Sequence, residues 1–189
     1  MQKKEARKFY RNKRQALAAT ERMKLDDLIL IHFQALHVPF IHTVLAYHPI
    51  EENNEPETAA CLGYLEFKNP AIKIAYPKTN FLTLQMEAVE VDPDTAFQKN
   101  PQNIIEPVNG IVISPGVIDL VLVPLLACDR QGYRVGYGKG FYDKYLSQCR
   151  PDCIRLGLSY FEPMDKITDR DEFDVPLSAC VTPYNSYVF

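Results

Sequence analysis

Residues 119–143 read DLVLVPLLACDRQGYRVGYGKGFYD, and three features of this stretch decide the fold. The first six residues, 119–124, form an apolar run of strand length, which is typical of a buried parallel strand. Four of the chain's eight glycines follow between Gly132 and Gly140, and such crowding marks a main chain that bends sharply or approaches a ligand closely. A helical pattern begins at Gly140 and runs to Cys149. The order of strand, glycine-rich turn and helix predicts an α/β unit.

The glycine-rich turn also carries charged residues that suit a phosphate and a metal ion. Backbone N–H groups and a helix N-terminus both favour an anion at such a turn. Arg134 and Lys139 add positive charge, and Asp143 could hold Mg²⁺ against the same phosphates. The spacing matches neither the GxxxxGK[ST] loop nor the GxGxxG dinucleotide motif. The alternative is a hairpin-like loop with solvated charges, but the strand context, the two cations and the acid together favour a ligand site.

The flanking sequence alternates between strand and helix patterns. This alternation predicts an α/β sandwich around a mostly parallel sheet, built as one domain over residues 1–189. Residues 92–110 are polar and contain proline, so we expect a surface excursion there. The expected helices cover residues 3–17, 20–36 with Thr20 as the cap, and 57–67 stopped by Asn69-Pro70; the expected strands cover 43–47, 72–76 ended by Pro77, 82–91 as a strand or hairpin, 154–158, and 179–182 as the last.

Composition separates the chain from membrane proteins and from bulk nucleic-acid binders. Of its 189 residues, 47% are hydrophobic and 24% are charged, and the net charge is −3. No apolar run approaches the ~20 residues of a membrane span. The first fourteen residues carry seven cations against the single acid Glu5, which on composition alone indicates a solvated cationic helix. The five cysteines have scattered spacing, so we expect reduced, mostly buried thiols and a cytoplasmic protein.

A long motif in residues 115–143 is similar to that of a known family. The segments PGVIDLVLVP, Gly132-Tyr-Arg and GYGKGFYD, with Asp129 between them, closely resemble the signature of 5-formyltetrahydrofolate cyclo-ligases, also called methenyltetrahydrofolate synthetases. The resemblance spans nearly the whole chain and is weak between about residues 82 and 109. It implies a three-layer NagB/RpiA/CoA-transferase-like architecture. The other matching segments are Lys3–Arg7, Glu55-Pro-Glu57-Thr58, Asp174-Val-Pro and Val181-Thr182.

The resemblance further implies a ligase that depends on ATP and Mg²⁺. The formyl oxygen of 5-formyltetrahydrofolate would attack the γ-phosphate of ATP, and N10 would then close on the activated carbon as phosphate leaves. The products would be 5,10-methenyltetrahydrofolate, ADP and phosphate. Phosphorylation is needed because an amide oxygen is a poor leaving group. Such a transfer requires positioning and charge neutralisation rather than a protein nucleophile.

The match assigns the nucleotide to the first helix and the glycine-rich loop. Lys3 and Arg7 lie one helical turn apart, so both can face one anion, and Lys4 lies beside them. Lys139 and Arg134 take the catalytic roles, with Lys139 nearest the transferring phosphate. The ATP loop implied by the match consists of Arg134, Val135, Gly136, Tyr137, Gly138, Lys139, Gly140, Phe141 and Tyr142.

The metal carboxylates implied by the match are Asp143 and Asp174. Taken alone, Asp174 is one acid among several neighbours, and such an acid is more often solvated than ligating. Family members commonly have a second aspartate four residues further on, where this chain has Ser178. The four histidines share no helical face, so they receive no metal role.

The folate contacts implied by the match start with Glu57, whose carboxylate would accept hydrogen bonds from the amino-pyrimidine edge of the pterin. Without the resemblance, Glu57 fits equally well as an acid favoured by a helix N-terminus. Ile50 is assigned loosely as an apolar contact. Tyr137 and Phe141 could stack on the flat ring, although core packing explains Phe141 as well. The remaining expected substrate contacts are Gly138, Lys139 and Gly140.

The expected partners are therefore ATP and a folate, which could carry a polyglutamate tail, with no nucleic acid and no membrane. We expect a monomer or weak homodimer. Two other classes of protein compete with this interpretation. One is a regulatory protein that keeps the pocket without turnover, and the other is a nucleic-acid module built on the basic first helix. The negative net charge disfavours the second.

Overall fold

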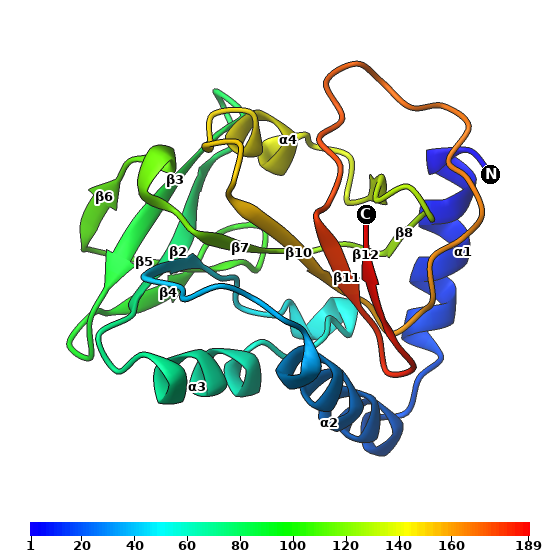
Figure 1. The fold of residues 1–189 in the computed structure, drawn as a ribbon. Helices are drawn as coiled ribbons and strands as arrows, with labels where there is room; N and C mark the ends of the chain where they lie inside the picture. Colours follow the sequence, from blue (N-terminus) through cyan, green and yellow to red (C-terminus); the bar gives the residue numbers. More distant parts are fainter.

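The computed structural model describes residues 1–189, which build an eight-stranded central sheet with helices on both faces (Figure 1). The strand order is β12-β11-β10-β7-β1-β2-β3-β6. Pairing is parallel from β11 through to β2, and β12, β3 and β6 add antiparallel edges. The strands of this sheet are β1 (Thr43–Leu45), β2 (Lys73–Asn80), β3 (Gln85–Val91), β6 (Ile111–Ile113), β7 (Leu120–Val123), β10 (Ile154–Leu158), β11 (Ala179–Val181) and β12 (Ser186–Val188).

Four α-helices and two short hairpin sheets complete the fold. The helices are α1 (Lys3–Gln15), α2 (Ala19–Ala35), α3 (Ala59–Lys68) and α4 (Phe141–Leu146), with 3-10 turns η1 (Glu51–Asn53) and η2 (Pro115–Val117). The small sheets are β4 (Phe97–Lys99) with β5 (Ile105–Pro107), and β8 (Ala127–Cys128) with β9 (Arg134–Val135).

Strand β7 lies in the middle of the sheet, and its side chains explain the layers. All four of its residues have no exposed surface. Because side chains alternate along a strand, Leu120 and Leu122 pack in the core beneath α1, α2 and α3, whereas Val121 and Val123 pack in the core beneath α4. The predicted three-layer α/β sandwich and the buried parallel strand at residues 119–124 are therefore confirmed.

The predicted helices are present, with small shifts at their ends. Helix α2 follows Ala18 as its N-cap, so Thr20 lies inside the first turn and is not the cap. Helix α3 begins after Thr58 and ends at Lys68, with Asn69, the predicted stop, as its C-cap. Helix α4 ends at Leu146, earlier than the pattern predicted, and turns continue the chain from there.

Strand β2 runs through Pro77, where the sequence predicted its end. β1 pairs with β2 only as far as Ala75, so Pro77 has a strand partner only on the β3 side. Because no strand pairs with Pro77 on the β1 side, the missing N–H of proline removes no strand-to-strand hydrogen bond on that side. β2 and β3 therefore continue as a hairpin to Asn80 and Gln85, and this hairpin forms part of the wall of the cavity described below.

The sequence did not predict several short strands, which are β6, the β8–β9 pair, the β4–β5 pair and β12. Residues 92–110 include the β4–β5 hairpin, and buried Glu106 in β5 accepts a hydrogen bond from the Thr79 N–H at 2.8 Å. Strand β12 follows β11 at the sheet edge, so residues 179–182 are not the last strand. The segment 92–110 is largely exposed, as predicted, and the strands missed here and at β12 have three residues each, too few to show a two-residue hydrophobic period.

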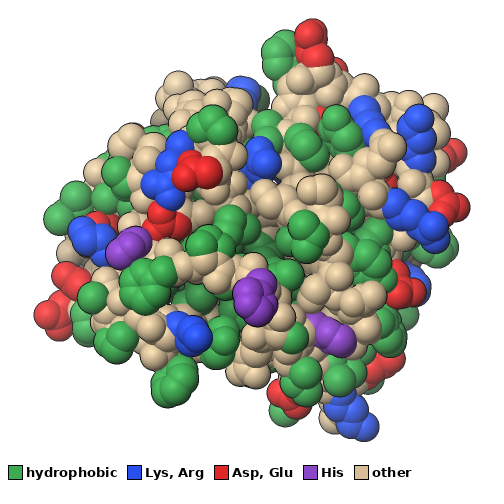
Figure 2. Space-filling model, in the orientation of Figure 1, with side chains coloured by type: hydrophobic (Ala, Val, Ile, Leu, Met, Phe, Trp, Pro, Cys, Tyr) green, Lys and Arg blue, Asp and Glu red, His purple; other side chains and the backbone are tan.

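Helix α1 presents most of its positive charge to solvent. Figure 2 shows Lys and Arg side chains gathered over the side of the molecule where α1 lies. The inner face of α1 contributes Ala6 and Tyr10 to the core, and near its C-terminal end Arg14 is buried, with 2% exposure. No helix has both the length and the apolar character that crossing a membrane requires.

Candidate active site

A cavity of about 460 Å³ lies where β1 and β7 end, the position at which open α/β sheets commonly bind ligands. Its walls come from α1, the loop after β1, the β2–β3 hairpin, the glycine loop and the chain around residue 174. This cavity brings together most of the predicted site residues. They are Lys3, Arg7, Ile50, Arg134, Gly136, Tyr137, Gly138, Lys139, Gly140, Phe141, Tyr142, Asp143 and Asp174.

The glycine loop follows β9 and leads directly into α4. Gly138 and Gly140 have φ angles of +87° and +73°, a backbone region that glycine adopts without steric cost. A Cβ at Gly138 would lie 3.2 Å from the Arg7 guanidinium carbon. Glycine at this position therefore allows the loop to pass close to α1.

Lys3 and Arg7 occupy one face of α1 and reach the cavity together. The Arg7 Nε donates to the Gly136 carbonyl at 3.0 Å. The Lys3 ammonium lies 2.6 and 2.5 Å from the two carboxylate oxygens of Asp174. Lys4 was predicted to bind ATP as well, but its side chain is exposed and does not line the cavity. The reason is geometric, because adjacent helical residues do not share a face.

Arg134 and Asp143 form a second ion pair in the cavity wall. The Arg134 Nη2 lies 2.6 Å from Asp143 Oδ1, and the Arg134 side chain is only 6% exposed. Burial lowers the pKa of Arg134 from its ordinary value, while Asp143 and Asp174 favour its charged form. The same Asp143 oxygen accepts from the Val175 N–H at 3.1 Å. Val135, also predicted to bind ATP, is buried in β9 and does not line the cavity, because successive strand residues point to opposite sides.

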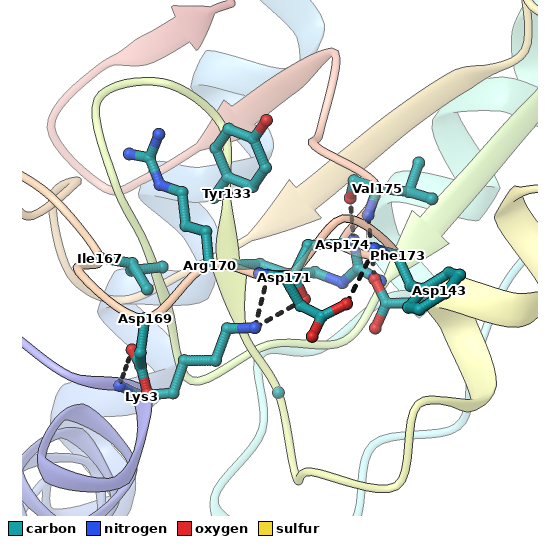
Figure 3. A network of polar contacts seen from close by, with 12 residues as sticks. Lys3, Tyr133, Asp143, Ile167, Asp169, Arg170, Asp171, Phe173, Asp174 and Val175 are labelled. Atoms are coloured by element: carbon teal, nitrogen blue, oxygen red, sulfur yellow. Dashed lines mark hydrogen bonds and ion pairs between the residues drawn. The ribbon is translucent and has the colours of Figure 1, made fainter.

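The segment 165–175, here called the strap, carries Asp174 to this position (Figure 3). The Lys3 N–H donates to Asp169 of the strap at 2.7 Å. In the middle, Arg170 pairs with fully buried Asp129 and stacks 4.2 Å from the Tyr133 ring centroid. These contacts connect the strap to α1 and to the loop before β9, and the Val175 N–H, which donates to Asp143, holds the chain on the other side of Asp174.

The donor set formed by Asp143 and Asp174 is compatible with Mg²⁺. Their side chains are 29% and 18% exposed, and both line the cavity. No cluster of three or more His, Cys, Asp or Glu side chains is present that could form a cage of protein ligands alone. Mg²⁺ is commonly bound by one or two carboxylates together with waters and substrate phosphates. The two carboxylates thus suit a metal ion that arrives with a phosphorylated ligand.

The acid that faces the remainder of the cavity is Glu55, which was not among the site residues predicted from the sequence. This residue is 8% exposed, and its carboxylate accepts hydrogen bonds from the Ile50 N–H at 2.7 Å and from the Tyr137 hydroxyl. Burial raises the pKa of Glu55 above its ordinary value, and these hydrogen bonds and Arg14 act in the opposite direction. The available signal was the motif itself, since Glu55 is the first residue of the Glu-x-x-Thr pattern.

Glu57, the predicted pterin ligand, does not line the cavity. Its carboxylate oxygen accepts from the backbone N–H groups of Thr58 at 2.8 Å and Ala59 at 3.1 Å. These are unpaired donors at the start of α3, and an acid is favoured there. The structure thus supports the helix-terminal interpretation of Glu57 and moves the cavity carboxylate to Glu55.

Three buried polar atoms in cavity-lining side chains have no hydrogen-bond partner in the protein. They are the hydroxyls of Tyr47 and Tyr142 and the Nε2 of His48. Burial raises the pKa of both phenols and lowers the pKa of His48, so all three groups are neutral near pH 7. The His48 ring is stacked on Tyr76 at 4.2 Å. Because an unsatisfied buried polar atom costs free energy, these atoms favour a ligand that carries matching polar groups.

The apolar part of the cavity includes Ile50 and Phe141, as predicted from the sequence. The Phe141 ring lies edge-to-face with Phe81, with 5.0 Å between the centroids, and both rings line the cavity. Phe141 also packs against the core beneath α4, so it takes part in both of the roles considered for it. Tyr137 lines the cavity with its hydroxyl engaged by Glu55 and Arg14.

The chain matches known proteins over nearly its whole length. The model of the 5-formyltetrahydrofolate cyclo-ligase family matches residues 1–183. The chain is 31% identical over 185 residues to the 5-formyltetrahydrofolate cyclo-ligase of Mycoplasma pneumoniae, covering 96% of this chain and 98% of the relative. For the corresponding protein of Mycoplasma genitalium the identity is 29%, covering 92% and 94%.

Solved structures lead to the same group of proteins. The 5,10-methenyltetrahydrofolate synthetase of Mycoplasma pneumoniae has a TM-score of 0.77 at 27% identity, covering 97% of this chain and 99% of that one. The synthetase of Aquifex aeolicus has a TM-score of 0.79 at 26% identity, covering 100% and 93%. Sequence and fold therefore agree over the residues that form the cavity.

Proposed function

The chain belongs to the 5-formyltetrahydrofolate cyclo-ligase family, and on that basis we propose that the cavity at the end of β1 and β7 holds ATP beside the folate. The enzyme is a ligase that converts 5-formyltetrahydrofolate to 5,10-methenyltetrahydrofolate. One observation carries the proposed arrangement. The same cavity joins a glycine loop flanked by cations to a buried carboxylate among aromatic side chains.

The triphosphate of ATP is proposed to lie between α1 and the glycine loop. Arg7 keeps its terminal guanidinium nitrogens free, because only its Nε is used by the Gly136 carbonyl. Lys139 lines the cavity and its ammonium engages no acid of the protein. Each charge-assisted contact with a phosphate oxygen contributes roughly 1.5–3 kcal/mol. Arg7 and Lys139 are therefore the proposed phosphate ligands, with Lys139 beside the transferring group.

Asp143 and Asp174 are proposed to hold Mg²⁺ against those phosphates. The ion, when bound, would neutralise phosphate charge and orient the terminal phosphate. Lys3 forms an ion pair with Asp174, and Arg134 forms one with Asp143. The strap and the Val175 N–H fix the direction in which the carboxylates point.

The pterin is proposed to lie against Glu55. A carboxylate can accept a pair of hydrogen bonds from the amino group and ring N–H of an amino-pyrimidine edge. The unpaired hydroxyls of Tyr47 and Tyr142 offer further polar contacts, and Ile50 and Phe141 offer apolar surface. This arrangement would give polar partners to the Tyr47 and Tyr142 hydroxyls, which the protein itself leaves unpaired.

The proposed chemistry needs charge stabilisation rather than a nucleophilic side chain. The formyl oxygen forms a bond to the γ-phosphorus while the bond to ADP breaks. N10 then bonds to the activated carbon, its proton leaves, and the carbon–oxygen bond to phosphate breaks. Lys139 and Arg7 would neutralise the charge that moves between these oxygens. The protein's task is to hold both substrates in line and to exclude water.

A direct assay tests the proposal. Purified protein is mixed with 5-formyltetrahydrofolate, ATP and Mg²⁺, and the near-ultraviolet absorbance of the methenyl product is followed. We expect product with the wild type and a loss of roughly 10²-fold in kcat/KM for Lys139→Ala, by analogy with the removal of one charge-stabilising donor. Lys144→Ala, an exposed cation outside the cavity, is the matched control. Absence of product from folded protein would leave a binding protein without turnover.

We also propose that the enzyme works in the cytoplasm as a monomer or weak homodimer, on folates that include polyglutamylated forms. All five cysteines are free, which suits a reducing compartment. Sedimentation at several protein concentrations tests the assembly state, and comparison of mono- and polyglutamylated substrates tests the preference for the tail.

A further inference from the structure

Arg14 differs from the other cations of α1 because it is buried. Its exposure is 2%, and no carboxylate lies within ion-pair distance of its guanidinium. The Nη1 donates to the Leu125 carbonyl at 3.0 Å, and the Nη2 donates to the Tyr137 hydroxyl at 2.5 Å. A buried charge is costly unless it is well paired, so a cation supported mainly by neutral acceptors calls for a functional reason.

The Tyr137 hydroxyl connects Arg14 to the cavity through two hydrogen bonds. It accepts from Arg14 and donates to Glu55 Oε1, while the Ile50 N–H donates to Glu55 Oε2. Arg14 itself does not line the cavity, whereas Tyr137 and Glu55 do. The result is a hydrogen-bonded series from a buried cation, through a phenol, to a carboxylate that faces the ligand.

The end of α1 is also attached to the backbone that presents Glu55. The Asn54 amide donates to the Arg14 carbonyl at 3.2 Å, and the Gln15 amide donates to the Glu52 carbonyl at 2.5 Å. Glu52 lies in η1, and Asn54 is the C-cap of η1 and immediately precedes Glu55. Helix α1 therefore sets the position of Glu55 through its backbone as well as through Tyr137.

We propose that Arg14 is a positioning residue that acts through Tyr137 to hold Glu55 as an oriented, ionised carboxylate for the amino-pyrimidine edge of the folate. This inference rests on the proposed function, in which Glu55 binds the pterin. Each carboxylate oxygen can accept two hydrogen bonds, and the protein uses one on each. One acceptor site therefore remains on each oxygen, which is what a pair of parallel donors requires.

Arg14 supplies the positive charge that opposes protonation of Glu55. Burial raises the pKa of Glu55, and the Ile50 and Tyr137 hydrogen bonds and the Arg14 charge lower it. The other titratable groups facing Glu55 are the phenols of Tyr47, Tyr137 and Tyr142, whose pKa values burial raises, so they stay neutral. Without Arg14, Glu55 would take up a proton at a higher pH and would lose acceptor capacity.

The test compares Arg14→Met with Arg11→Met, a matched change of an exposed arginine on the same helix. We expect the acidic limb of the pH profile of kcat/KM for 5-formyltetrahydrofolate to move upward by about half a unit or more in Arg14→Met. The KM for the folate should rise roughly tenfold at neutral pH, and the KM for ATP should stay within about twofold. Arg14→Lys, which keeps the charge, should restore the position of the limb.

Tyr137→Phe provides an independent variant, because it keeps the ring and removes only the hydroxyl. It should show the same rise in folate KM, and adding Arg14→Met to it should cause little further loss, as expected for residues that act in series. An unchanged acidic limb in both single variants, or a loss confined to the KM for ATP, would overturn the proposal. If Arg14→Met does not fold, Tyr137→Phe alone decides.

A spectroscopic titration separates this inference from the proposed function. Carbon-13 labelling of the glutamate carboxyl groups, with Glu55→Gln to assign the signal, reports the protonation of Glu55 without turnover. We expect the midpoint to rise in Arg14→Met and to stay unchanged in Arg11→Met. If the midpoint of Glu55 is higher in Arg14→Met than in the wild type but the wild type forms no methenyl product, the function is refuted and the role of Arg14 stands. If the wild type and Arg14→Met have equal midpoints, the role of Arg14 alone is refuted.

Discussion

Glu55 and Glu57 are separated only by Pro56, yet their carboxylates have different neighbours. Glu55 lies between the Ile50 N–H and the Tyr137 hydroxyl and faces the cavity. Glu57 accepts from the first N–H groups of α3. At the scale of the residue, the local course of the backbone after β1 decides which acid can meet a ligand.

A pair of substitutions tests this difference. Glu55→Gln replaces a charged acceptor by a neutral amide, so the KM for 5-formyltetrahydrofolate should rise roughly tenfold or more, the range for a lost charged hydrogen bond. Glu57→Gln keeps an acceptor at the helix start and should leave this KM within about twofold, with at most a small loss of thermal stability. Steady-state kinetics on both variants measures the contrast, and equal effects would contradict the assignment.

At the scale of the element, the glycine loop depends on a backbone that other residues do not adopt readily. Gly138 has φ +87° and passes close to the Arg7 guanidinium. Gly136 lies in the same loop, but its φ is not positive and a Cβ at this position would meet no atom within 4 Å. The two glycines therefore differ in the reason for their presence.

Alanine at each position separates these reasons. Gly138→Ala forces a strained φ, which costs about 1–3 kcal/mol, and displaces Arg7, so kcat/KM for ATP should fall roughly tenfold or more. Gly136→Ala meets neither obstacle and should lose clearly less. Kinetics at saturating folate measures both, and a larger loss for Gly136→Ala would show that the loop is organised differently.

Strand β10 and helix α3 give a second contrast between glycines. A Cβ at Gly157 in β10 would lie 2.7 Å from Leu125 and 2.9 Å from Leu177, so Gly157→Ala should destabilise the fold by about 1–3 kcal/mol through overpacking. Gly63 in α3 is exposed and has no atom nearby, so Gly63→Ala should stabilise by about 0.5–1 kcal/mol. Denaturant unfolding measures both signs, and a destabilised Gly63→Ala would contradict the description of α3.

At the scale of the whole molecule, Asp119 links segments that are distant in the sequence. It precedes β7 and accepts from the N–H groups of His42 at 2.6 Å and Thr43 at 2.8 Å, and it pairs with Arg150. Burial raises the pKa of Asp119, but the hydrogen bonds from Thr43, Arg150 and His42 outweigh this, so its pKa is lowered overall.

A lowered pKa makes the contribution of Asp119 to stability dependent on pH. The unfolded chain binds this proton more tightly than the folded protein does, so the stabilisation is complete above the ordinary aspartate pKa of about 4 and is lost as pH falls below it. Asp119→Asn should therefore lower the Tm at pH 7, and the difference from wild type should shrink below about pH 4. Asp152→Asn, at an exposed partner of Arg150, is the control. A difference that does not change with pH would point to packing instead of charge.

Much of this architecture can be predicted from local pattern. The continuous apolar run of β7 and the glycine-rich turn after it carry their signals within a few residues, because burial and backbone bending act locally. The helix stop at Asn69 is local in the same way. The end of β2 at Asn80 and the end of α4 at Leu146 are not local, because they depend on which neighbouring strand or turn is present.

The interior of the site is harder to predict because its contacts join distant residues. Lys3 and Asp174 are 171 positions apart, and Tyr137 and Glu55 are 82 positions apart. No periodicity reports such pairings. Arg14 shows the same limitation, since in the sequence it is one of seven early cations and only packing distinguishes it.

The two ion pairs in the cavity wall have a consequence for charge balance. Lys3 is offset by Asp174 and Arg134 by Asp143, which leaves Arg7 and Lys139 as the unpaired cations beside the glycine loop, while the remaining acid of the cavity, Glu55, is assigned to the pterin. Two positive charges match the net charge of about minus two on a magnesium–ATP complex and fall short of the charge on the metal-free nucleotide. The charge of the cavity wall would then favour the magnesium complex over the metal-free nucleotide, and no further residue would be needed to distinguish the two forms.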